Sequence, residues 1–467
     1  MNAPTRTASS AQILTVAAAF FLEVLDATVM IVAIVPMANA INASISEVTL
    51  SLATYVLALA VFTPLSGYVF NQRGLAGKFQ SGVLIFFVGS WVCALSPDLY
   101  TLCFGRFIQG FGSALIVPAG RALILAHTPK PLLPRTMAWL IAPALTAPMA
   151  APYIATLMLS AGGWRLIFVF VALLAVALFI ACRLLLRSLP SPVAKRTPLN
   201  RRAYALWTLF CVALFMVFVF SSTHQGYYAA MAAGWMLIGG ALLTLTLRSA
   251  RHTALFDLHL LNNPLFKLNL VSGSLFRISI YAFPTLLIIG LMENADAPAV
   301  FTGHCLFFIF AGNVLAKPIA VKLLTGCRHL KFFFICASLA TTLSLGLFYN
   351  TPLIQEPITL WGLCFVHGCA RSVQFLAYST TSLWGIEHTR LHNATVLMSS
   401  VMQLNALIGQ SVPALLAAFY NPARWLPGES DLVFFHMGLA TVTVLSGITV
   451  LTAACLPSAI SPPSRTQ

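Results

Sequence analysis

The chain has 467 residues, of which 59% are hydrophobic and 8% are charged, and its formal net charge is +15. A soluble globular protein has about 25% of its residues as Asp, Glu, Lys and Arg, so this composition excludes a soluble fold. A strongly basic chain can bind nucleic acid, but no RNA- or DNA-reading motif is present in the sequence. We therefore expect a polytopic membrane protein that does not bind nucleic acid.

Fourteen apolar segments follow one another along the chain, each long enough to cross the hydrocarbon core of a bilayer as a helix. They are too long and too uniformly apolar for the short alternating strands of a membrane β-barrel. The sequence therefore predicts an all-α polytopic membrane protein with fourteen transmembrane helices. The predicted spans are 12–38, 48–70, 79–96, 99–127, 135–158, 164–187, 203–221, 226–247, 266–291, 298–324, 328–348, 356–380, 393–420 and 432–456.

Two polar, basic segments, 188–202 and 248–264, divide the spans into groups of six, two and six. This division predicts an N-terminal six-helix bundle over residues 1–190 and a C-terminal six-helix bundle with its tail over residues 264–467. Residues 191–263 would hold cytoplasmic linkers and two inserted transmembrane helices. Equal six-helix bundles are typical of transporters built from structural repeats, so we expect a pseudo-two-fold relation between them.

The loops alternate in charge along the chain. Lys and Arg gather in every second loop, Arg165 and Arg424 being exceptions, while Asp and Glu gather in the others. Positively charged loops stay in the cytoplasm, so we expect a multi-pass membrane protein with both termini cytoplasmic. The first segment has the length of a full span and is expected to remain as a helix rather than to be a cleaved signal. The excess of basic residues is expected to contact anionic lipid headgroups.

Motifs of enzyme and metal chemistry are missing from the sequence. There is no phosphate-binding Walker loop and no nucleophile elbow, and the cysteines are scattered through apolar spans without metal-ligand spacing. We therefore expect no enzymatic activity, no cofactor and no metal site.

Two carboxylates, Glu23 and Asp26, lie in the first predicted span, where a charged group is costly and usually functional. Three residues apart on a helix, they share a face with Cβ atoms about 5–6 Å apart. Burial and mutual repulsion both oppose ionisation of the two groups together, so we expect them to share a proton. The sequence thus predicts a proton-coupling pair. The alternatives are that Glu23 only faces a water-filled vestibule and that Asp26 only holds the helix through hydrogen bonds.

Arginines also lie inside predicted spans, at Arg106, Arg277 and Arg371. Because a guanidinium stays protonated, each must face a cavity, a carboxylate, backbone carbonyls or an anionic substrate. For Arg106 we expect the carboxylate pair of the first span as partner, which adds it to the proton-coupling residues. Arg277 and Arg371 have no acid in the spans of their own half, which favours a substrate with a carboxylate or phosphate. Capping of carbonyls or snorkelling to the interface is the alternative for both.

Other polar side chains in the spans are candidates for binding substrate. His367 lies one helical turn before Arg371, although a lone buried histidine is more often a hydrogen-bonded packing residue. Gln109 lies in the fourth span, and Gln403 in the thirteenth, where a glutamine can line a cavity or join helices. The predicted substrate-binding residues are Arg277, Arg371, His367, Gln109 and Gln403.

Three motifs carry a family resemblance. Leu25, Asp26, Ala27 and Thr28 are followed by Ala33 and Pro36, and the fourth span contains Arg106, Gln109, Gly110 and Gly112 in the pattern RxxQGxG. Between the second and third spans, Gly67, Arg73 and Gly74 resemble a cytoplasmic loop motif, GxxxDRxG, in which Asn71 takes the position of the Asp. Over nearly its whole length the chain resembles the major facilitator superfamily, in the fourteen-helix drug:proton antiporter branch of bacterial multidrug exporters.

The resemblance implies gating and coupling roles for the matching residues. The loop motif, with Gly67, Asn71, Arg73 and Gly74, would gate the cytoplasmic side, and Asn71 weakens its charge relay. Pro148 would act in gating too, but Ala147-Pro148 and Ala151-Pro152 replace the glycine-rich signature associated with antiport.

The function that we expect is proton-coupled export of small organic molecules by alternating access, carried out by a monomer. The resemblance implies multidrug efflux across a bacterial inner membrane. Two alternatives remain: an exporter or importer of a specific anionic metabolite or metal chelator, and a non-transporting sensor or inactive paralogue that has lost gate residues.

Overall fold

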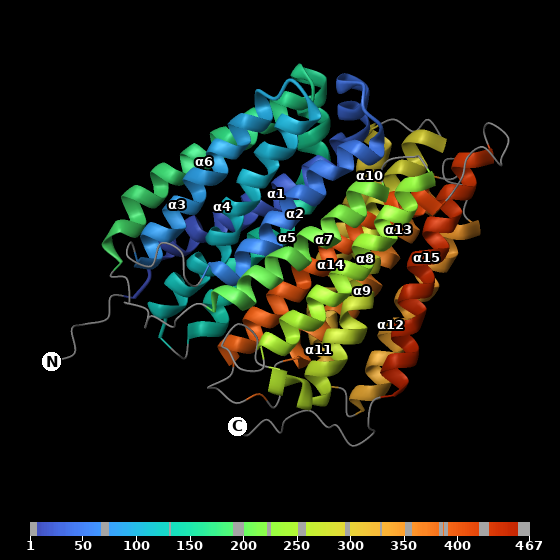
Figure 1. Cartoon of the computed structure of the whole chain (residues 1–467). Helices are drawn as coiled ribbons and strands as arrows, with labels where there is room; N and C mark the ends of the chain where they lie inside the picture. The colour runs from blue at the N-terminus through green and yellow to red at the C-terminus, as the bar shows by residue number, and fades with distance from the viewer. Residues whose placement is uncertain are drawn as a thin grey trace. The chain divides into compact units, whose positions relative to one another are not determined.

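The computed structural model describes residues 7–66, 74–129, 132–189, 200–221, 226–250, 258–294, 299–326, 329–350, 357–382, 386, 391–419 and 429–455. These residues are almost entirely helical and contain no β-strand (Figure 1). The chain divides into two compact units, unit 1 over Met1–Phe215 and unit 2 over Met216–Gln467. The predicted division at residues 190 and 263 stays a prediction.

Unit 1 contains six complete helices and most of a seventh, which continues past the unit boundary. They are α1 (Ser10–Ile41), α2 (Ile45–Leu65), α3 (Gly74–Ala94), α4 (Leu99–Ala126), α5 (Leu133–Gly162), α6 (Trp164–Leu185) and α7 (Arg201–Ser221). Unit 2 contains the remaining helices. They are α8 (Gly226–Ala250), α9 (Pro264–Asn294), α10 (Ala299–Leu315), α11 (Lys317–Gly326), α12 (Leu330–Leu347), α13 (Pro357–Thr381), α14 (Leu391–Phe419) and α15 (Glu429–Ala454).

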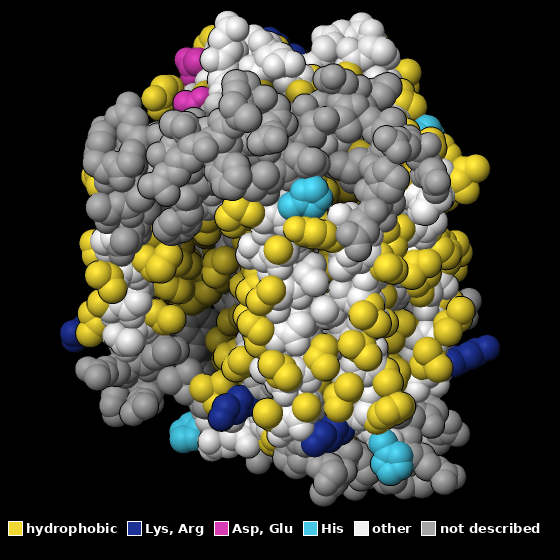
Figure 2. Space-filling model, turned by 90° about the vertical axis from the view of Figure 1, so that its right-hand side faces the viewer, with side chains coloured by type: hydrophobic (Ala, Val, Ile, Leu, Met, Phe, Trp, Pro, Cys, Tyr) yellow, Lys and Arg dark blue, Asp and Glu magenta, His cyan; other side chains and the backbone are white. Residues whose placement is uncertain are grey.

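All fourteen predicted spans fall on helices, with α10 and α11 together forming the tenth, which confirms an all-α polytopic membrane protein. Within the described residues, eleven helical segments are long and apolar enough to cross a bilayer. The other three predicted spans are α8, whose apolar part is Gly234–Thr246, and the more polar α13 and α14. Figure 2 shows hydrophobic side chains over the middle of one face, with most of the visible Lys and Arg side chains in its lower half.

Local sequence signals set where the first helices begin. Ser9 starts α1 with a capping box, in which its hydroxyl accepts from the Gln12 N–H and the Gln12 side chain accepts from the Ser9 N–H. Ser44 and Glu47 form the same box at α2. Asp98 caps α4, accepting from the Thr101 N–H at 2.8 Å, and this bond holds the pKa of the Asp98 carboxyl below its usual range.

The tenth predicted span, 298–324, is formed by two consecutive helices, and its part Val300–Leu324 is long and apolar enough to cross a bilayer. α10 ends at Leu315 and α11 begins at Lys317, with Ala316 between them. Pro318 follows directly, and a proline has no N–H for the helical ladder and clashes with the carbonyl four residues earlier. The boundary is local, since the Ala316 N–H still donates to the Gly312 carbonyl at 3.0 Å and the Ala320 N–H to the Ala316 carbonyl at 2.8 Å.

Glycines bring α3 and α4 close together in unit 1. A Cβ added at Gly89 of α3 would lie 2.6 Å from the Gln109 backbone nitrogen, and one at Gly112 of α4 would lie 2.6 Å from the Phe86 nitrogen. Gly110 meets α2 in the same way, at the Tyr55 carbonyl oxygen. In a bilayer, where apolar surface gains little by leaving lipid, close backbone packing of this kind is a main source of helix association.

Adding one methyl group at this contact tests the packing. We expect Gly112→Ala to destabilise the protein by about 1–3 kcal/mol, because the new Cβ meets the backbone of α3, which cannot move aside as a flexible side chain could. Gly346→Ala on α12 is the matched control, since no atom lies within 4 Å of its added Cβ. Thermal unfolding in detergent measures both variants. Equal melting temperatures for the two would contradict the packing described.

Candidate functional site

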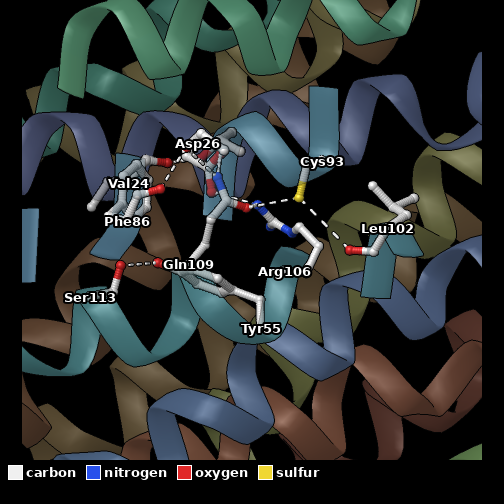
Figure 3. Close-up of polar contacts among 11 residues, drawn as sticks. Val24, Asp26, Tyr55, Phe86, Cys93, Leu102, Arg106, Gln109 and Ser113 are labelled. Atoms are coloured by element: carbon white, nitrogen blue, oxygen red, sulfur yellow. Dashed lines mark hydrogen bonds and ion pairs between the residues drawn. The ribbon is translucent and has the colours of Figure 1, made fainter. Parts of the chain in front are cut away.

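A buried ion pair joins α1 to α4. Asp26 and Arg106 are both fully buried, and Arg106 Nη1 donates to Asp26 Oδ2 at 2.6 Å (Figure 3). It is the one salt bridge found among the described residues. A charge-assisted bond in an apolar interior is strong, but each ion has lost its hydration, so removing either partner leaves a costly unpaired charge.

Gln109 of α4 connects this ion pair to α3. Arg106 can only donate, which fixes the Gln109 Oε1 atom as the acceptor of its second bond, at 2.8 Å. The Gln109 amide nitrogen donates to Ser90 Oγ at 2.8 Å and, weakly, to Asp26 Oδ1 at 3.4 Å. Cys93 Sγ lies 3.5 Å from Gln109 Oε1. The glutamine thus touches both members of the ion pair, so a change in the charge of Asp26 changes its hydrogen bonds as well.

Aromatic rings surround the rest of the guanidinium. Arg106 Cζ lies 4.6 Å from the centroid of Tyr55 of α2 and 6.0 Å from that of Phe168 of α6. The Tyr55 hydroxyl donates to Ser113 Oγ at 2.8 Å, which holds the ring in place. Among the described residues, Arg106 Nε and Nη2 have no hydrogen-bond partner. Cation–π attraction therefore stabilises the cation where hydrogen bonds do not.

The RxxQGxG pattern has a direct structural reason. Arg106 and Gln109 lie three residues apart on α4, so their side chains share a face toward Asp26. Gly110 and Gly112 allow the backbones of α2 and α3 to approach α4 on either side. Larger residues there would move Tyr55 and Ser90 away from the ion pair.

Glu23 and Asp26 have different partners, although they were predicted as a pair. Asp26 is bonded to Arg106, whereas Glu23 is half-buried and has no hydrogen bond to a described residue. Glu23 instead interacts electrostatically with Arg121 of α4 and, with like charge, with Asp26. Arg121 Nε is buried without a partner among the described residues. Whether the two carboxylates share a proton stays a prediction.

Most of the predicted gating loop cannot be placed. Gly67, Asn71 and Arg73 lie outside the described residues. Gly74 is the first residue of α3 and has a φ of 65°, a left-handed conformation that glycine adopts without strain. Pro148 is buried within α5, between the fully buried Ala147 and Ala151, and α5 packs against α1. The gating roles of these residues stay predictions.

Arg277 lies against its own helix in unit 2. Its exposed fraction is 1%, and its Nη1 donates to the Asn269 carbonyl oxygen at 3.5 Å, along a groove left open by Gly273. Phe375 of α13 lies 6.0 Å from the guanidinium carbon, and Nε has no partner among the described residues. Capping of a backbone carbonyl is the alternative that the sequence predicts for Arg277, and this contact is of that kind.

Arg371 lies in a different environment. It is half-buried on α13, its Cζ is 5.5 Å from the Phe310 ring of α10, and its Nη1 is buried with no partner among the described residues. Arg371 interacts electrostatically with Tyr281 of α9 and repels Lys317 of α11.

His367 and Gln403 are not brought to Arg277. His367 is fully buried between Phe283 and Phe348, with ring centroids 4.6 and 6.1 Å away. Since Ser344 donates its proton to the Thr341 carbonyl at 2.7 Å, the His367 Nδ1 atom donates to Ser344 Oγ at 2.9 Å. Gln403 is half-buried on α14 and has no hydrogen bond to another described residue. Their substrate-binding roles stay predictions.

Several site residues were missed from the sequence. Arg121 falls inside the predicted fourth span, 99–127, so the count of charges in spans that identifies Arg106 also finds it. Lys317 lies inside the predicted tenth span in the same way. Tyr55, Ser90 and Cys93 carry no signal in the sequence, because only the packing of three helices brings Tyr55 to Arg106 and the other two to Gln109. Within the described part of the chain, no cluster of three or more His, Cys, Asp or Glu side chains could hold a metal ion.

Comparisons with known proteins agree on the family. Two relatives carry the name multidrug resistance protein MdtD. The protein of Escherichia coli O139:H28 is 25% identical over 439 residues, covering 93% of this chain and 92% of that protein. The protein of Escherichia coli K12 is 26% identical over 443 residues, with the same coverage.

A solved structure shares the fold. A POT family transporter, crystallised in complex with a thioalcohol-conjugated peptide, matches with a TM-score of 0.68 at 17% identity, over 94% of this chain and 95% of that one. The family model described as Major Facilitator Superfamily matches residues 16–410. The chain therefore belongs to the Major Facilitator Superfamily.

Proposed function

We propose that this protein is a proton-coupled exporter of small organic molecules that works by alternating access. It would act as a monomer, without a cofactor or enzymatic step, in the bacterial inner membrane. Both termini would lie in the cytoplasm, and its basic loops would contact anionic headgroups. Membership of a transporter superfamily and relatives named as multidrug resistance proteins support this proposal.

The buried ion pair of Asp26 and Arg106 is the observation that carries the proposal. A transporter that couples to protons needs an acid whose protonation changes the stability of one conformation relative to another. Asp26 is fully buried, and its main partner is a cation that cannot release its own proton. A proton that reaches Asp26 therefore breaks a buried ion pair rather than a solvated one.

Protonation would drive a conformational change through charge imbalance. Neutral Asp26 no longer balances Arg106, so the guanidinium is left buried with the Gln109 Oε1 acceptor and aromatic faces alone. Such a state is unstable by several kcal/mol until Arg106 reaches water or another anion. Protonation from outside would thus favour one access state, and release of the proton to the cytoplasm would restore the ion pair. The same cost argues against a protein that has lost coupling, since idle buried charges only destabilise it.

Replacing Asp26 tests the coupling. In inverted vesicles from a pump-deficient host, with a panel of cationic, neutral and anionic dyes, we expect wild-type protein to release protons when a transported dye is added. Asp26→Asn should lose more than 90% of this release, because an amide cannot bind and release a proton. Asp98→Asn, which replaces an exposed helix-capping carboxylate of α4, is the matched control and should keep it. Proton release by Asp26→Asn equal to that of wild type would refute the assignment.

A double-mutant cycle tests the ion pair itself. Asp26→Asn and Arg106→Gln should each destabilise the protein by about 3–5 kcal/mol, since each leaves one buried charge unpaired. The double variant should regain most of that stability, because it contains neither charge, and yet remain inactive in proton release. Thermal unfolding in detergent measures the cycle. Strictly additive losses would show that the two side chains do not interact.

A further inference from the structure

Two basic residues, Lys317 of α11 and Arg371 of α13, lie near the contact between α10 and α13 in unit 2. The helices approach closely at two glycines, because a Cβ at Gly312 would meet the Phe365 carbonyl oxygen and one at Gly368 would meet that of Ile309. Ser372 Oγ donates to the Asn313 carbonyl oxygen at 2.6 Å, which fixes the register of the two helices. Arg371 precedes Ser372, and Lys317 lies one turn beyond Asn313. The packing therefore places the two cations at neighbouring positions.

Neither cation forms a salt bridge with a described residue. The sequences of α10, α11 and α13 contain no Asp or Glu; the acids of unit 2 are Asp257, Glu293, Asp296, Glu356, Glu387, Glu429 and Asp431. Arg106 and Arg121 of unit 1 have acidic partners in Asp26 and Glu23. Like charges held together in an apolar region are costly. An anion bound between Arg371 and Lys317 would remove this cost.

Snorkelling to the bilayer surface does not account for Arg371. It lies ten residues before the end of α13 at Thr381, a distance of about 15 Å along a helix, which is longer than its side chain. Its guanidinium also has a buried Nη1 without a hydrogen-bond partner in the described residues, and the Phe310 ring lies 5.5 Å from its Cζ. The group thus has a buried, unsatisfied donor beside an aromatic ring.

We propose that Arg371 and Lys317 form a subsite for the carboxylate, sulfonate or phosphate group of an aromatic organic anion. The guanidinium would bind two oxygens, the ammonium would add a second charge, and the Phe310 ring would contact the apolar part of the ligand. This inference rests on the proposed transport function, since it names the chemical class of a substrate. Such a subsite would recognise its ligand by charge as well as by hydrophobic contact.

Equilibrium binding of fluorescein, an aromatic dianion, tests the subsite. Fluorescence anisotropy on purified protein in neutral detergent should give a saturable Kd, raised at least tenfold in Arg371→Gln and in Lys317→Gln. Arg371→Lys should restore part of the affinity, because it keeps the charge but not the two-pronged geometry. Lys322→Gln, which removes an exposed positive charge one turn away on α11, is the matched control and should bind as wild type does. Rhodamine 6G, a cationic dye, should not bind more weakly to either Gln variant.

Three results would overturn the proposal: no saturable binding of fluorescein, equal Kd values in the Gln variants and Lys322→Gln, or equal weakening for both dyes. Adding phosphatidylglycerol in mixed micelles tests whether the two cations bind an anionic lipid headgroup instead of a substrate. Abolition of fluorescein binding by this lipid, but not by phosphatidylcholine, would assign the pair to headgroups instead. Thermal unfolding of each variant checks that it folds.

The fluorescein-binding experiment and the proton-release experiment test different claims and can fail independently. Binding is measured without a proton gradient, so Asp26→Asn should keep the Kd for fluorescein within about threefold of wild type. Failure of dye-induced proton release together with intact fluorescein binding would refute the transport function alone. Intact proton release together with charge-independent binding would refute the subsite alone.

Discussion

The ion pair between Asp26 and Arg106 depends on the whole packing of unit 1. Two ions can stay in an apolar interior only at short distance and with their remaining bonds partly satisfied. Here α1 supplies the acid and α4 the base, while Ser90 of α3 and Tyr55 of α2 position the groups around them. The glycines of α3 and α4 make the distances possible, so the helix packing and the chemistry of the site are one arrangement.

The two units differ in how they balance charge. In unit 1, Asp26 has a direct cationic partner, and Glu23 interacts with Arg121 at longer range. In unit 2, Arg277 donates to a carbonyl of its own helix, while Arg371 interacts electrostatically with Tyr281 and repels Lys317. A carboxylate that is paired with a cation suits proton exchange, because protonation removes the attraction that holds the pair together. A buried cation without an anionic partner suits ligand binding, because an anionic ligand can supply the missing negative charge.

The break at Ala316 shows how a small sequence feature can shape such a site. Pro318 cannot continue the hydrogen-bond ladder of α10, so a new helix begins at Lys317. The close approach of α10 and α13 at Gly312 and Gly368 then brings that residue to Arg371. The predicted span 298–324 covers both helices, and hydropathy alone does not mark the boundary between them.

The sequence by itself determined the fold class, the membrane segments and the partnership of Arg106 with the first helix, because apolar length and the cost of a buried charge are local properties of the chain. It also determined that Asp26 and Glu23 lie on one face. Only the tertiary structure decided that Asp26, and not Glu23, pairs with Arg106, that Gln109 joins the ion pair, and that Lys317 lies within electrostatic range of Arg371. These contacts join helices that are far apart in the chain. Their distances depend on close packing at glycines, and the sequence of one helix does not specify which other helix packs against it.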